Sequence, residues 1–124
     1  MKQEMANQLV RSREIEWKPL PEPDSEGVFV KVLQFDKEAK RAPTFLLKFE
    51  AGATYPPHNH PGGEEIFVIE GDIRLGKDHL YAGDYLYTAP DGKHAVRSEG
   101  GCVVLVKTPQ AVEILLNRKI KKDE

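Results

Sequence analysis

Alternating apolar and polar positions run through the middle of the chain and predict a succession of short β-strands. These segments are rich in β-branched and aromatic residues and are separated by glycines, which mark turns. Short strands at intervals of about 8–12 residues with regular turns are typical of an all-β sandwich or barrel. The predicted strands are residues 28–35, 44–49, 66–69, 72–75, 84–88 and 102–107.

A polar N-terminal segment, residues 1–26, ends in a proline-rich stretch. Pro19, Pro21 and Pro23 lie within five residues, which excludes a helix and a central strand. We therefore expect an arm that is ordered by packing on the barrel or on a second subunit, with Trp17 as its anchor. The predicted organisation is an N-terminal arm at 1–26, a β-barrel at 27–110 and a C-terminal extension at 111–124.

The connections between the predicted strands carry further local signals. Gly71-Asp72 follows an apolar run and indicates a hairpin turn. His79 follows Gly76-Lys77-Asp78, and we expect it in an exposed loop. Residues 110–120 fit either a short helix or a last strand, because Leu115 and Leu116 do not distinguish the two periods.

Composition narrows the class of protein. The 124 residues fit one domain, and 31% charged with 40% apolar residues is ordinary for a globular chain. A net charge of −2 argues against a nucleic-acid partner. No apolar run approaches the roughly 20 residues that cross a bilayer, and no secretion signal is visible, so we expect a cytoplasmic protein without a membrane partner. Cys102, the single cysteine, excludes an intrachain disulfide and is expected to be a buried core thiol.

The run from His58 to Glu65 is the strongest chemical signal in the chain. His58 and His60 are separated by one residue, so on an extended chain both imidazoles point to the same side. A carboxylate follows across the Gly62-Gly63 turn, and His94 can add a third nitrogen donor from beyond a later turn. Three imidazoles and one carboxylate suit Zn, Fe, Mn, Ni or Cu better than Ca or Mg. We therefore predict one divalent metal ion per chain, with Zn, Fe, Mn or Ni as the candidates.

Glu64 and Glu65 compete for the carboxylate position. Strand alternation places Glu64 on one face with Ile66 and Val68, and Glu65 on the other face with Phe67 and Ile69. Tyr85 and Tyr87 also share one face of a strand, where we expect ordinary packing, with a place at the mouth of a pocket as the alternative. The residues alone leave the carboxylate open.

The sequence around these residues resembles the cupin superfamily. Its first motif is matched without a gap by Gly52, His58, His60, Glu64 and Gly71. The second motif is matched at Gly83 and His94, whereas the places of its Pro, Gly and Asn hold Ala89, Asp91 and Ser98. The resemblance implies a cupin double-stranded β-helix, a small jelly-roll-like barrel. It also implies the metal ligands His58, His60, Glu64 and His94, and it leaves Glu65 as a surface group or one that orients a ligand.

Within the cupins, residues 15–108 are most similar to the ChrR-like group, which includes the C-terminal half of a zinc-binding anti-sigma factor. The resemblance implies the cupin domain and its metal but not sigma binding, and it implies a homodimer. Three functions compete. They are a metalloenzyme, oxygenase- or isomerase-like, acting on a small organic molecule; a zinc-binding sensor of a small ligand or of stress; and a structural dimer with a vestigial site. No catalytic residue is predicted.

Overall fold

The computed structural model describes residues 6–22, 24–35, 42–60, 62–90 and 92–108, apart from the side chains of 56–60, 92 and 93. In this part of the chain one short 3-10 helix precedes nine strands, which confirms the all-β prediction. The predicted segment 110–120 and the extension 111–124 lie outside the described residues. The elements are η2 (Ser12–Glu14), β1 (Lys18–Pro19), β2 (Val28–Gln34), β3 (Thr44–Phe49), β4 (Thr54–His60), β5 (Glu64–Leu75), β6 (Asp78–Tyr81), β7 (Tyr85–Thr88), β8 (Gly92–Arg97) and β9 (Cys102–Lys107).

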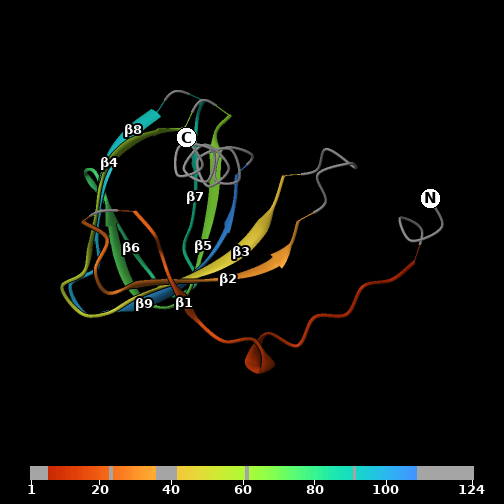
Figure 1. Cartoon of the computed structure of the whole chain (residues 1–124). Coiled ribbons are helices and arrows are strands. Elements are labelled where there is room, and N and C mark those ends of the chain that lie inside the picture. The colour runs from red at the N-terminus through yellow and green to blue at the C-terminus, as the bar shows by residue number, and fades with distance from the viewer. Residues whose placement is uncertain (1–5, 23, 36–41, 61, 91, 109–124) are drawn as a thin grey trace, which may run out of the picture.

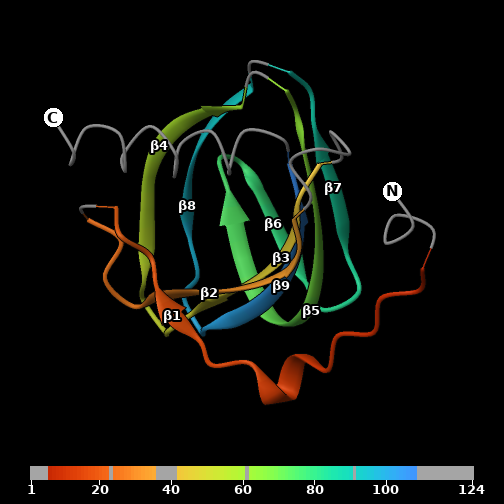
Figure 2. The same ribbon diagram turned by 45° about the vertical axis from the view of Figure 1, so that its right-hand side comes forward.

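The strands form one continuous antiparallel sheet that curls around a common interior (Figures 1 and 2). Its order is β1-β2-β3-β9-β5-β8-β4, and β6 and β7 each pair with β5 as well. β5 therefore belongs to both halves of the barrel. Its first part pairs with β7 and β9, and its last four residues pair with β6. Because β5 joins the two halves, its ends are held by different neighbours.

The hairpin predicted at Gly71-Asp72 is wrong, and the two short strands predicted on either side of it are one strand, β5. Gly71 has φ +81° and lies where β5 passes from one half of the barrel to the other. Its register partner is Cys102, and a Cβ at Gly71 would lie 2.0 Å from the Gly101 carbonyl oxygen. The glycine thus permits a close crossing of two backbones instead of a chain reversal. The reversal comes at Gly76, where the hairpin to β6 begins.

Apolar side chains from one face of β2, β3, β5, β6, β8 and β9 fill the barrel. Residues in β5 alternate between buried and exposed from Glu64 to Ile69, as the sequence predicts. Cys102 is buried, which confirms the expected core thiol, and burial raises the pKa of that thiol. The core consists of Val28, Phe45, Phe49, Ala53, Ile66, Val68, Ile73, Leu75, Leu80, Val96, Cys102, Val104 and Val106.

The N-terminal arm packs against the outer face of β2 and β3, and Trp17 anchors it as expected. The Lys31 Nζ lies 4.6 Å from the centroid of the Trp17 ring, and the Lys48 Nζ lies 5.0 Å from it. Lys31 is buried as a residue, and its ammonium donates a 2.6 Å, partly buried hydrogen bond to the Ser12 carbonyl oxygen. Two cation–π contacts of about 0.5–2 kcal/mol each hold the indole. The proline-rich stretch contributes the short strand β1, which lies at the edge of the sheet, where proline is tolerated.

No helix in the described ranges is long and apolar enough to cross a membrane.

Candidate metal centre

Glu64 begins β5 and points into the barrel. Its side chain is 9% exposed, and its strand neighbours on the same face are the core residues Ile66 and Val68. Burial disfavours the charged carboxylate and raises the pKa of Glu64 from 4.5 to about 7. A carboxyl group held this way becomes a strong anionic ligand when a cation replaces its proton.

His94 lies beside this carboxyl group. Its Nε2 is 3.7 Å from the Glu64 Oε1, and its side chain is 8% exposed. The two residues come from strands that are remote along the chain, β5 and β8. The fold therefore brings together two of the four predicted ligands inside the barrel.

The other two predicted ligands lie on β4, which pairs with β8. His58 is the register partner of His94, and His60 is the register partner of Gly92. Residues directly opposite each other in an antiparallel pair are about 4.5–5.5 Å apart at Cβ and share one face of the sheet. The positions of His58 and His60 thus lie next to that of His94, while their side chains are outside the described part of the structure.

Glu65 lies on the opposite face of β5. It is exposed, and its Oε1 accepts a 2.9 Å hydrogen bond from the Tyr85 hydroxyl, which raises the pKa of Tyr85. Tyr85 and Tyr87 share this outer face and are more than half exposed, so they do not line the interior. Of the two neighbouring carboxylates, only Glu64 faces His94.

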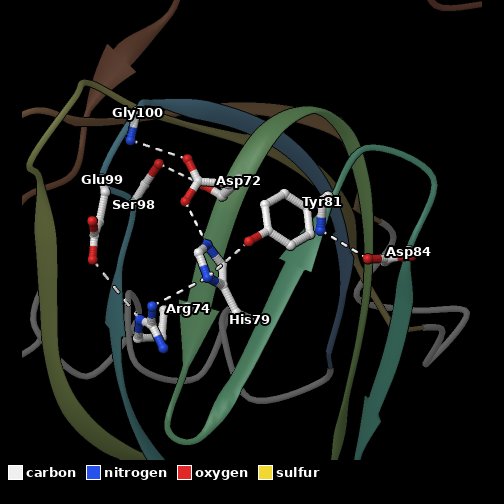
Figure 3. Close-up of polar contacts among 8 residues, drawn as sticks. All are labelled: Asp72, Arg74, His79, Tyr81, Asp84, Ser98, Glu99 and Gly100. Carbon is white, nitrogen blue, oxygen red and sulfur yellow. Dashed lines mark hydrogen bonds and ion pairs between the residues drawn. The ribbon is translucent and has the colours of Figure 1, made fainter.

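A second polar cluster lies outside the barrel, where the sequence predicted only a loop (Figure 3). His79 is in strand β6, half-buried, and stacks on Tyr81 with ring centroids 4.5 Å apart. Its Nε2 lies 2.7 Å from the Asp72 Oδ2, and its Nδ1 lies 3.1 Å from an Arg74 Nη2 and 3.2 Å from the Tyr81 hydroxyl. The expected exposed loop is wrong, because the hairpin after Gly76 places this residue on a strand.

The cluster has a consistent proton arrangement. With the Nε2–H of His79 donating to Asp72, the Nδ1 accepts from Arg74 and Tyr81. The hydrogen bond from His79 lowers the pKa of Asp72, whose other oxygen accepts from the Gly100 backbone N–H at 3.0 Å. These residues tie β5 and β6 to the loop between β8 and β9. Sequence reasoning missed them because their partners are set by strand register and not by spacing.

Comparison with known proteins identifies the family and fold of the chain. A search of curated proteins finds no match. Among solved structures, the polyketide cyclase RemF from Streptomyces resistomycificus is 19% identical, with a TM-score of 0.74 over 84% of this chain and 80% of that one. A putative acetylacetone dioxygenase from Methylibium petroleiphilum is 22% identical, with a TM-score of 0.76 over 83% of this chain and 76% of that one.

A third similar structure is the complex of Rhodobacter sphaeroides SigE with the anti-sigma ChrR. The match is 27% identical, with a TM-score of 0.66, and covers 79% of this chain but only 51% of that one. These neighbours confirm the predicted cupin double-stranded β-helix. The family model of the ChrR cupin-like domain matches residues 5–112. The chain therefore belongs to the ChrR cupin-like family of the cupin superfamily.

Proposed function

We propose that this protein holds one divalent transition-metal ion inside its barrel, through His58, His60, Glu64 and His94. The observation that supports the proposal best is the buried Glu64 carboxyl group, which lies 3.7 Å from the His94 Nε2 and on the same strand face as the core residues Ile66 and Val68. An ionisable carboxyl in such a place has a high cost unless a cation or another partner compensates it. The β4–β8 register adds two histidine positions to the same region.

The donor set fits a transition metal. Three neutral imidazoles and one carboxylate suit Zn, Fe, Mn or Ni, and such a set leaves room for a further ligand. A bound metal would supply Lewis-acid or redox chemistry to a small molecule at that open position. The chain's own residues would provide the ligands and shield them from water. Glu64 gives up its proton to become a ligand, and burial keeps bulk water from Glu64 and His94, which are 9% and 8% exposed.

We propose a metalloenzyme of the oxygenase or isomerase kind, acting on a small organic molecule. The same fold serves a polyketide cyclase and a putative acetylacetone dioxygenase, so this frame accommodates enzymes that differ in chemistry. A second candidate, a zinc-binding sensor, is favoured by the family match and by the 27% identity to the ChrR complex. X-ray absorption of the protein as purified from cells separates the two. Iron or manganese with an exchangeable ligand supports the enzyme, and zinc with four protein ligands supports the sensor.

Loss of His94 is expected to weaken metal binding by at least about 100-fold, because a lost ligand costs more than the 10–100-fold typical of a lost supporting group. The measurement is a Zn²⁺ competition titration of metal-free wild-type protein and His94→Ala. His79→Ala is the matched control, since it removes a histidine that bonds Asp72 on the outer face. Equal affinities for His94→Ala and wild type would contradict the proposed ligand set.

We also propose that the protein is a homodimer that pairs through the outer face of β5 and β7. Phe67 lies opposite both Tyr85 and Leu105 in register, and Phe67, Ile69 and Tyr85 are each more than 40% exposed. Adjacent exposed apolar side chains on the outer face of a sheet are typical of protein interfaces.

Light scattering is expected to give twice the 14.0 kDa chain mass for the wild type and the single-chain mass for Phe67→Glu. Val32→Glu, at a similarly exposed apolar position on β2, is the control and is expected to stay dimeric. A wild type at the single-chain mass would contradict the dimer. Dissociation by Val32→Glu but not by Phe67→Glu would contradict the proposed face.

A further inference from the structure

Thr108 lies one residue beyond the end of β9, beside the beginning of β5. The ladder between these strands has its last pair at Glu65 and Lys107, so it does not reach Glu64. Thr108 stands where the next pair would be. Its side chain is buried, and its Oγ1 donates a 2.8 Å hydrogen bond to the Gly63 carbonyl oxygen. A side-chain hydroxyl thus extends the attachment between the two strands by one residue.

Gly63, which accepts this bond, immediately precedes Glu64 and is tightly placed. Its φ is +82°, and a Cβ at this position would lie 3.1 Å from the Tyr87 hydroxyl oxygen and 3.2 Å from the Thr88 carbonyl oxygen. β7 therefore packs closely against the turn on one side, while Thr108 holds its carbonyl oxygen. The residue has little room to move in either direction.

The orientation of this carbonyl governs the direction of the Glu64 side chain. The peptide group is planar, so fixing the Gly63 carbonyl also fixes the amide nitrogen of Glu64. With that plane fixed and Glu64 paired with Thr88 on β7, the Cα–Cβ bond of Glu64 is directed into the interior. The pairing with Thr88 holds this peptide from the β7 side, and the Thr108 hydroxyl holds its carbonyl oxygen from the β9 side, so loss of the hydroxyl removes the β9-side restraint.

We infer that Thr108 is a positioning residue for Glu64 and that the Thr108 hydroxyl orients the Glu64 carboxylate toward His94. The inference rests on the proposed metal site. It adds a residue to that site from outside the motif residues, one that is not a metal ligand and acts through the Gly63 carbonyl oxygen. Thr108→Val, which keeps the shape and removes the hydroxyl, is expected to lose metal affinity, and Thr108→Ser is expected to retain it.

The test compares metal-free wild type, Thr108→Val and Thr108→Ser by Zn²⁺ competition and by the absorption spectrum of the Co²⁺-loaded protein. We expect Thr108→Val to bind Zn²⁺ about tenfold more weakly, in line with other groups that orient metal ligands. We also expect its Co²⁺ spectrum to change, because the carboxylate oxygen no longer meets the metal in the same geometry. Thr108→Ser is expected to restore both readouts. Thr44→Val, at the same end of the barrel beside Lys107, is the control and is expected to match the wild type.

The outcomes distinguish failure of the proposed metal site from failure of the proposed role of Thr108. A wild type that binds neither Zn²⁺ nor Co²⁺ would overturn the proposed site itself. A wild type that binds, together with a Thr108→Val protein of equal affinity and unchanged Co²⁺ spectrum, would overturn only the role of Thr108. A lower melting temperature with an unchanged spectrum would also overturn it, since that is the result of a purely structural bond. If Thr108→Val does not fold, Thr108→Ala against Thr108→Ser makes the same comparison.

Discussion

Replacing Glu64 by Gln is expected to weaken metal binding by at least about 100-fold and to stabilise the metal-free protein at pH 8. The two effects have one cause. Burial makes the carboxylate costly in the metal-free fold, and a metal ion removes that cost. Gln has nearly the same shape, carries no charge and resembles the protonated acid. It therefore relieves the metal-free protein of the buried charge and deprives the metal of an anionic ligand.

The pH dependence of this effect follows from the direction of the shift. Folding raises the pKa of Glu64 from 4.5 to about 7, so between these values the folded state binds more protons than the unfolded state. Stability from the protonated acid is complete below about pH 4.5 and is lost as the pH rises through about 7. The shift corresponds to a loss of about 3 kcal/mol in the free energy of unfolding.

Urea denaturation of the metal-free proteins at pH 5 and pH 8 measures this loss. The wild type is expected to lose stability relative to Glu64→Gln between these pH values, and the two are expected to be similar at pH 5. Glu65→Gln is the matched control, because its carboxylate is exposed and bonded to Tyr85, and it is expected to follow the wild type. Parallel pH profiles for wild type and Glu64→Gln, or a larger loss of metal affinity in Glu65→Gln, would contradict the assignment of the carboxylate.

Gly71→Ala is expected to be the most damaging single-methyl substitution in the described part of the barrel. The added Cβ would lie 2.0 Å from the Gly101 carbonyl oxygen and 2.7 Å from the Cys102 Cα. Both are backbone atoms, so no side-chain rotation can relieve the clash. Relief would require separating β5 from β9 where β5 passes between the two halves of the barrel. We expect a loss of at least about 4 kcal/mol, a large fraction of the stability of a typical domain.

Gly83→Ala is the matched control for this steric effect. Gly83 also has a positive φ, +92°, but a Cβ there would meet nothing within 4 Å. It should cost only the backbone strain of a left-handed residue, about 1–2 kcal/mol. Urea denaturation monitored by circular dichroism gives both values. Equal losses for the two variants would show that backbone strain alone, and not the crossing of β5 and β9, makes Gly71 necessary.

The alternation of apolar and polar residues predicted much of the barrel, because successive side chains of a strand point to opposite faces of the sheet. Alternation predicted β3 and β9 at their observed bounds, and it separated Glu64 from Glu65 by face. The same logic failed at Gly71, because a glycine in a strand resembles a glycine in a turn until the approaching strand is known. Strands β6 and β8 were also missed. Each has only two apolar side chains, so the alternation of apolar and polar residues in the sequence is weak there.

The candidate site was predictable where its residues lie close in sequence and unpredictable where the fold supplies the neighbours. His58, His60 and Glu64 lie within seven residues, and His94 was predicted as a ligand from its place in the second motif, although its 3.7 Å approach to Glu64 depends on the curl of the sheet. The Asp72–His79 pair and the bond from Thr108 to Gly63 join residues whose side chains carry no motif. Their contacts follow from strand register, which is set by packing across the whole barrel.

The metal content of the protein is the most direct test of the proposed metal centre. Elemental analysis of the wild type, as purified and after reconstitution with Zn²⁺, Fe²⁺ or Mn²⁺, is expected to give about one metal ion per chain. The double variant His58→Ala, His60→Ala is expected to give none. A wild type that carries no metal even after reconstitution, or a double variant that keeps its metal, would contradict the proposal that these residues form a metal centre.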